Sequence, residues 1–183
     1  MAGKINVSAG FCAAVLIMAW YQTELCPAFL LSVVTHELGH LSVLWLLKQP
    51  VRHFRLKISG AEIGIGLLDN RRELLCAMAG PLAGIVLGLA LLRIWPLCGI
   101  LSLCLSCGNL LPLYPLDGGR ILRCLLSCFF SAEKVYIILK SISFVTAAAV
   151  MVAACWATVC LQAGIWPIFA ALIMLWRTGE WEK

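Results

Sequence analysis

The feature that most constrains the fold of this chain is a series of apolar stretches, most of them nearly long enough to cross a bilayer as a helix. They cover about residues 5–20, 25–47, 74–95, 97–116, 135–161 and 163–176, and a spanning helix needs ~20 residues. Hydrophobic residues make up 62% of the chain and charged residues 13%, far from the balance of soluble domains. We therefore predict an all-α polytopic membrane protein with about six transmembrane helices. Five is the alternative, because the first and last stretches are short.

The basic residues predict how such a protein is oriented. They crowd the connection after the second stretch: Lys48, Arg52, Arg55, Lys57, Arg71 and Arg72. The positive-inside rule then places both termini and the 48–73 loop in the cytoplasm of a multi-pass cell-membrane protein. This asymmetry accounts for the net charge of +5, so no nucleic-acid partner is needed. A signal peptide over Val7–Trp20 is the alternative for the first stretch, but no small-residue cleavage site follows it.

A different pattern occupies residues 51–67, where apolar side chains alternate with basic residues and then with glycines. A period of two on both sides of Ser59-Gly60 predicts a small membrane-associated β-hairpin. It is either an ordinary surface hairpin or an open strand edge that pairs with an extended peptide. In the second case, Ile63 and Ile65 are candidate substrate-binding residues.

Two further patterns are interpreted as packing. The ten cysteines lie almost all within apolar stretches, where they serve as small residues compatible with lipid. A second C-x-x-C that would complete a zinc site with Cys104 and Cys107 is missing from the sequence. Gly80, Gly84 and Gly88 are four residues apart, which predicts a small-residue ridge for close helix–helix contact.

The apolar stretch 25–47 contains His36-Glu37-Leu38-Gly39-His40, an H-E-x-x-H sequence. Residues i and i+4 share one face of a helix, so both imidazoles can reach one metal ion. Ionisable groups are costly within a bilayer and usually functional there. We therefore interpret His36 and His40 as metal ligands rather than as two buried histidines satisfied by their neighbours.

A catalytic zinc site has three protein ligands and one open position. Besides Glu37, Asp117 is the one acidic residue deep in apolar sequence, within NLLPLYPLDGGR, residues 109–120. Pro112 and Pro115 interrupt a helix there, which is tolerated at membrane depth where the backbone lines a cavity or is covered by protein. We favour Asp117 as the third ligand over its alternative role as the N-cap of a following helix.

The two motifs together resemble the site-2 protease family of intramembrane metalloproteases, and the short chain with its hairpin resembles the sporulation branch typified by stage IV sporulation protein FB. The resemblance covers about residues 5–130. It implies one Zn²⁺ held by His36, His40 and Asp117, with Glu37 as catalytic acid/base. It also implies that Asn109 positions the substrate or stabilises the oxyanion.

The resemblance has limits. Because only 76 residues separate His40 from Asp117, we expect no PDZ insertion there, and we expect no nucleotide-sensing CBS domain after the last apolar stretch. We expect one transmembrane domain over residues 1–183, with a catalytic core at about 5–130 and C-terminal helices at 131–183. At residue 84, where family members often have Asn, this chain has Gly.

The sequence thus predicts a zinc metalloendopeptidase that cleaves a membrane-associated protein substrate, with its active site nearer the cytoplasmic side. The resemblance further implies a sporulation sigma-factor precursor as substrate and regulatory membrane proteins as partners. Two alternatives remain. The chain could be an inactive membrane scaffold, although Glu37 and all three ligands are present. It could also be a metal transporter that uses the His/Asp cluster.

Overall fold

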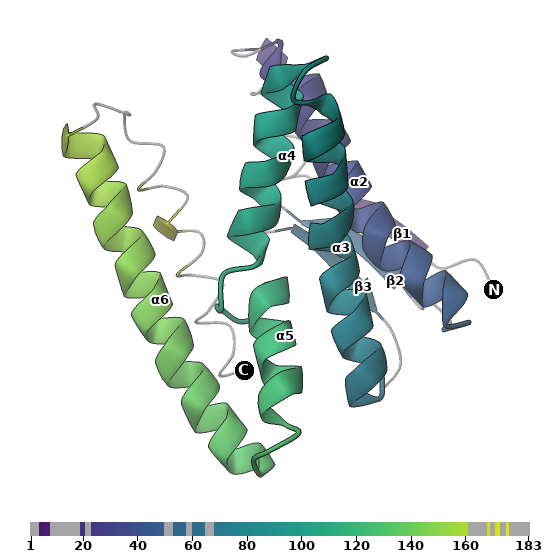
Figure 1. The fold of residues 1–183 in the computed structure, drawn as a ribbon, viewed down its shortest axis with the longest axis vertical. Coiled ribbons are helices and arrows are strands. Elements are labelled where there is room, and N and C mark those ends of the chain that lie inside the picture. Colours follow the sequence, from purple (N-terminus) through teal and green to yellow (C-terminus); the bar gives the residue numbers. More distant parts are fainter. Residues whose placement is uncertain are drawn as a thin grey trace. The chain divides into compact units, whose positions relative to one another are not determined.

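A computed structural model describes residues 4–7, 19–20, 23–49, 53–57, 60–64 and 68–160, together with residues 168, 171, 172 and 175. The elements within these ranges are β1 (Lys4–Val7), α2 (Leu25–Leu46), β2 (His53–Lys57), β3 (Gly60–Gly64), α3 (Asn70–Leu91), α4 (Pro96–Asn109), α5 (Asp117–Leu126) and α6 (Ala132–Cys160) (Figure 1). The chain divides into two compact units, Met1–Leu110 and Leu111–Lys183.

Three of the described helices are long and apolar enough to cross a bilayer, namely α2, α3 and α6. The described residues therefore contain three candidate spans, whereas the sequence predicts about six. The predicted span 97–116 is too long, because α4 has 14 residues and ends at Asn109. Pro112 and Pro115 follow within seven residues, and proline has no N–H to continue a helix. Most of the predicted span 163–176 lies outside the described residues.

A three-stranded sheet belongs to the first unit, with strand order β1-β2-β3. β2 and β3 lie within the stretch predicted as a hairpin and pair antiparallel, with Phe54 opposite Ile63. β1 pairs parallel with β2, and Ile5 lies opposite Phe54. The sequence interpretation was wrong at this point, because it began a transmembrane helix at residue 5. Lys4-Ile5-Asn6-Val7 alternates polar and apolar residues, which is the strand period.

Helices α2, α3 and α4 pack closely because glycines face their neighbours' main chains. A Cβ added at Gly39 of α2 would lie 2.5 Å from the Ala79 carbonyl oxygen of α3. On the predicted ridge of α3, Cβ atoms at Gly84 and Gly88 would collide with Ser106 and Leu103 of α4. The packing role predicted for these two glycines is confirmed. Small residues let helix backbones approach closely where lipid offers no hydrophobic drive for helix association.

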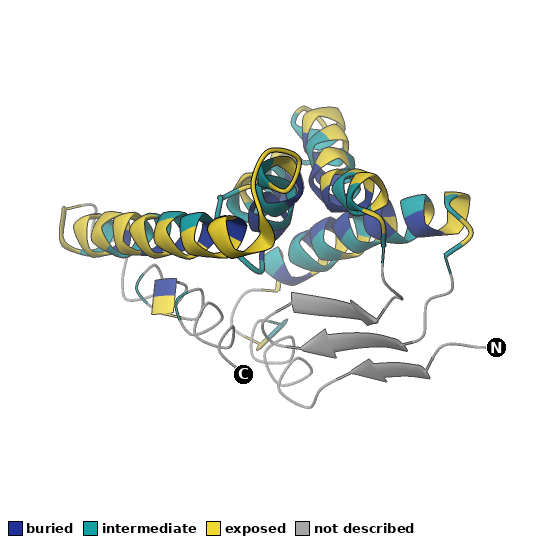
Figure 2. Cartoon of the chain, turned by 90° about the horizontal axis from the view of Figure 1, so that it is seen from below, coloured by how far each residue is buried: buried dark blue, intermediate teal, exposed yellow. Residues whose placement is uncertain are grey.

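The first unit buries several polar side chains and exposes many large apolar ones. Ser102 is buried and its Oγ donates to the Gly84 carbonyl at 2.8 Å, while the Ser106 Oγ donates to the Ser102 carbonyl at 2.8 Å. In contrast, Trp45 and Val86 are largely exposed. Figure 2 shows such exposed residues on the described helices. This arrangement suits a lipid environment, where apolar side chains face hydrocarbon and polar groups must find partners within the protein.

In the second unit, the connection between residues 110 and 117 packs on α6. Leu113 and Leu116 form a buried cluster with Ala147 of α6. The Tyr114 N–H donates to the Ser143 Oγ at 3.1 Å. The hydrogen bond gives a partner to one backbone N–H of a segment that is not regular helix, and α5 begins directly after this segment at Asp117.

The α3–α4 contact yields a test of the packing. Replacing Gly99 with alanine should lower the thermal stability of the purified protein, because the new Cβ would lie 2.9 Å from main-chain atoms of Gly88 and Leu92. Overpacking of this kind costs about 1–3 kcal/mol. Gly108→Ala is the matched control, since a Cβ there has nothing within 4 Å. Equal melting temperatures for the two variants would contradict the close α3–α4 packing.

Candidate metal centre

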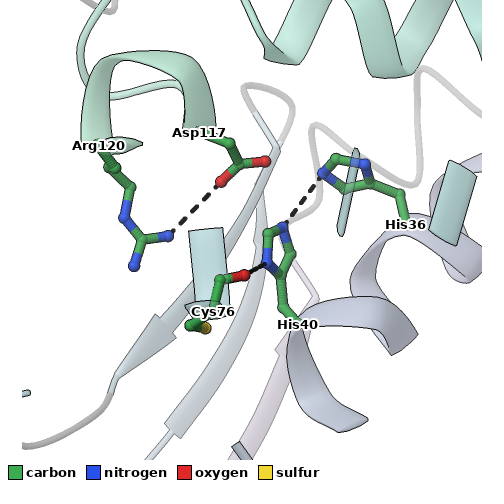
Figure 3. A network of polar contacts seen from close by, with 5 residues as sticks. All are labelled: His36, His40, Cys76, Asp117 and Arg120. Carbon is green, nitrogen blue, oxygen red and sulfur yellow. Dashed lines mark hydrogen bonds and ion pairs between the residues drawn. The ribbon is translucent and has the colours of Figure 1, made fainter. Parts of the chain in front are cut away.

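Helix α2 brings the two predicted histidines together. They are four residues apart on one face and both are buried, with 4% of His36 and 5% of His40 exposed. Their Nε2 atoms lie 3.2 Å apart, and their rings meet edge to face with planes at 81° (Figure 3). The spacing of the H-E-x-x-H sequence therefore places two imidazole nitrogens at one point, as predicted from helical periodicity.

The orientation of His40 is set by helix α3. Its Nδ1 lies 2.7 Å from the Cys76 carbonyl oxygen (Figure 3). A carbonyl only accepts hydrogen bonds, so Nδ1 carries the proton and donates it. In a neutral imidazole the Nε2 atom is then unprotonated and carries a lone pair. Histidine ligands in metal sites are commonly oriented in this way, by a carbonyl or carboxylate on the ring nitrogen that does not bind the metal.

The two histidines fit a zinc ion by their geometry and by their chemistry. Two nitrogens bound to a tetrahedral zinc at ~2.0–2.1 Å are about 3.3–3.4 Å apart, and the observed Nε2–Nε2 distance is 3.2 Å. Imidazole nitrogen is among the preferred ligands of zinc. Space is also left for the His40 ring, because Gly80 of α3 has no side chain where that ring lies.

Asp117 belongs to the second unit and is the first residue of α5. It is buried, and its Oδ1 lies 3.6 Å from Nη1 of Arg120, one turn along the helix (Figure 3). The N-cap is Leu116, and no side-chain capping bond is formed there. The alternative interpretation of Asp117 as the N-cap is therefore wrong. A carboxylate in the first turn is still favoured by the helix dipole.

His36, His40 and Asp117 are each buried, and each offers one atom of a kind that binds metal ions. Two of these residues come from the first unit and one from the second. The donor set of two imidazoles and one carboxylate is one that catalytic zinc sites use.

The remaining predicted site residues have distinct surroundings. Glu37 follows His36 on α2 and is half-buried, so its carboxyl group is less enclosed than the histidines. Asn109 is the last residue of α4 and is also half-buried. Its Nδ2 donates to the Leu105 carbonyl at 3.1 Å. That bond uses one of the two N–H groups of the amide.

The hairpin candidates are described only in part. Ile63 lies in β3, opposite Phe54 of β2. Within the described sheet β3 is at an edge, because its paired neighbour is β2. Ile65 lies outside the described residues.

The sequence interpretation missed two contacts that α3 makes with the His40 ring. One is with the Cys76 carbonyl, and the other is with the bare Cα of Gly80, that is, a Cα without a side chain. A main-chain acceptor leaves no signal in residue type, because every residue has a carbonyl. Gly80 did carry a signal, because it belongs to the glycine ridge and Gly80-Pro81 matches a glycine–proline feature of the family that the sequence resembles, but the ridge was interpreted as helix packing.

Comparison with known proteins places these features in context. The sequence model described as Peptidase family M50 matches residues 90–153. A zinc metalloprotease of Methanocaldococcus jannaschii is 35% identical over 109 residues, which cover 52% of this chain and 32% of that protein. The chain thus spans about a third of the length of this curated relative.

The fold has a counterpart among solved structures. The site-2 protease from Methanocaldococcus jannaschii aligns with a TM-score of 0.71 and 24% sequence identity, covering 98% of this chain and 90% of that chain. At this identity the likeness shows a shared fold.

Proposed function

We propose that this chain belongs to peptidase family M50 and is an intramembrane zinc metalloprotease. It would hydrolyse a peptide bond in or near a membrane-associated segment of a protein substrate. The observation that carries the proposal is the buried pair of imidazole Nε2 atoms, 3.2 Å apart, within a helix apolar enough to span a bilayer. Ionisable side chains are energetically costly within a bilayer, and those that occur there usually have a function.

In this proposal His36, His40 and Asp117 hold one Zn²⁺ ion per chain. When bound, zinc polarises a carbonyl oxygen as a Lewis acid and lowers the pKa of water towards ~7. The buried donor set supports this assignment, because the burial of all three residues limits competing water. Burial also strengthens electrostatic interactions at the site.

The proton transfers fall to Glu37. Its carboxylate accepts a proton from the attacking water and later delivers it to the leaving amine nitrogen, as a general base and then a general acid. Its place next to His36 on α2, half-buried, supports this role. Asn109 would donate a hydrogen bond to the peptide oxygen as negative charge develops, a contribution typically worth ~3 kcal/mol.

The substrate must present an extended segment, because a helix hides its carbonyl groups within its own hydrogen bonds. The edge position of β3 supports its use as a pairing strand for that segment, with Ile63 and Ile65 at the contact. A sporulation sigma-factor precursor as substrate, and regulatory membrane proteins as partners, rest on the sequence resemblance alone.

We also propose that both termini lie in the cytoplasm and that residues 1–183 act as one domain. The support for this orientation is the basic loop at 48–73. His36 and His40 precede the end of α2 by ten and six residues, which corresponds to ~9–15 Å of helix. The site would then lie below the cytoplasmic surface of the bilayer.

The test is metal-dependent cleavage by the purified protein in liposomes that carry membrane-tethered candidate substrates. A chelator such as 1,10-phenanthroline should stop cleavage, and stoichiometric Zn²⁺ should restore it, because the ion supplies the Lewis acid. Cleavage that persists in metal-free protein would contradict the proposal. Tightly bound zinc without cleavage would favour the scaffold, and zinc transport into the liposomes would favour the transporter.

A further inference from the structure

We propose that helix α3 is a positioning element of the metal centre, in which the Cys76 carbonyl and the bare Cα of Gly80 together fix the ring of His40. The inference rests on the proposed zinc site and assigns a role to residues outside both sequence motifs. It is carried by two separate contacts between α3 and the same imidazole.

The first contact fixes the tautomer and one end of the ring. The Nδ1–H of His40 donates to the Cys76 carbonyl at 2.7 Å, and both groups are buried. A buried polar group that loses its partner pays its desolvation cost, typically ~1–3 kcal/mol. The ring is therefore held with Nδ1 towards α3 and Nε2 towards His36, at 3.2 Å.

The second contact fixes where the other end of the ring lies. A Cβ built at Gly80 would be 2.2 Å from Nε2, 2.5 Å from Cε1 and 2.8 Å from Cδ2 of His40. The three distances show that the ring passes directly over the Cα of Gly80. The shortest of them is to the nitrogen whose lone pair is assigned to the metal, so any side chain at residue 80 would displace that atom.

The two helices cannot simply move apart to relieve such a side chain. One residue before His40, a Cβ at Gly39 would lie 2.5 Å from the Ala79 carbonyl oxygen and 2.8 Å from the Ala83 Cβ. This close backbone contact adjoins the His40–Gly80 contact on both helices. Separating α2 from α3 would break this backbone contact, so the His40 imidazole is the group that would move.

Gly80 also differs from the other glycines of the ridge. At Gly84 the added Cβ would meet the Ser106 Oγ at 2.2 Å, and at Gly88 it would meet Leu103 at 2.6 Å, both on α4. The overlap at Gly84 is as severe as at Gly80, but it involves the Ser106 hydroxyl of α4, and no histidine atom is among the three nearest atoms. Gly84→Ala is therefore a matched control for Gly80→Ala.

The experiment compares zinc affinity, measured by chelator competition, for the full chain and these two variants. Gly80→Ala should weaken zinc binding about 10–100-fold, the usual effect of losing the outer support of a metal ligand. Gly84→Ala should bind zinc as the unmodified chain does. With Co²⁺ in place of zinc, the visible spectrum should change for Gly80→Ala alone. Unchanged zinc affinity and an unchanged spectrum in Gly80→Ala would overturn the proposal.

A double-mutant cycle keeps the proposal testable if Gly80→Ala is poorly stable. Gly80→Ala should lower the melting temperature of metal-free protein when His40 is present, and should lower it much less in a His40→Ala background. Equal penalties in both backgrounds would show that Gly80 acts through helix packing alone, and would overturn the proposal. A chain that binds no zinc at all would refute the proposed function. This cycle would still show whether Gly80 and His40 are in contact.

Discussion

Replacing Glu37 with glutamine is expected to slow peptide cleavage about 10²–10⁴-fold, the range associated with general acid–base catalysis, while zinc stays bound. Glutamine has nearly the same shape as glutamate but cannot accept or release a proton at neutral pH. Glu37 is not one of the three proposed ligands, so the donor set of His36, His40 and Asp117 is left intact.

The measurement pairs cleavage rate with zinc content in the same preparation. Glu24→Gln is the matched control, because Glu24 precedes the same helix and is exposed, so it should retain both activity and metal. A Glu37→Gln variant that cleaves at the normal rate would refute the acid/base role. One that loses its zinc would show instead that Glu37 is a ligand or holds one in place.

Replacing Asp117 with asparagine should remove both zinc and activity. The substitution keeps the shape of the side chain but takes away the negative charge that balances the ion, and a catalytic zinc site has three protein ligands. It also weakens the contact with Arg120 at 3.6 Å, but that guanidinium is partly exposed and keeps access to solvent. The folded state should therefore survive the change.

Zinc content after dialysis and the thermal melting curve separate the two effects. Asp69→Asn is the control, because Asp69 is exposed and precedes α3 without a side-chain capping bond. Asp69→Asn should keep its zinc. Stoichiometric zinc and full activity in Asp117→Asn would exclude the three-ligand centre and would require another residue to complete it.

The parts of the fold that the sequence predicted well are those set by local periodicity. The apolar stretch 25–47 became α2 at Leu25–Leu46, and the four-residue spacing of His36 and His40 brought their Nε2 atoms together. Both results follow from the geometry of one helix. Helical rise and angular spacing are the same in every context, so no knowledge of the neighbouring elements was required.

Hydropathy missed two element boundaries, and a third feature depends on a contact between elements. Hydropathy did not reveal that α4 ends at Asn109, because the residues after it are as apolar as those before. Hydropathy also did not reveal β1, because an apolar stretch follows its four residues directly. The support of His40 by the Cys76 carbonyl depends on how α3 packs against α2, which no residue type encodes.

The parallel pairing of β1 with β2 has a topological consequence. Residues 4–7 and 53–56 are partners in one sheet, and strands of four and five residues are far shorter than the ~9–11 needed to cross a bilayer. We therefore expect both ends of the intervening chain to lie on one side of the membrane. A tag at the N-terminus and a reporter beside His53 should thus sense the same compartment.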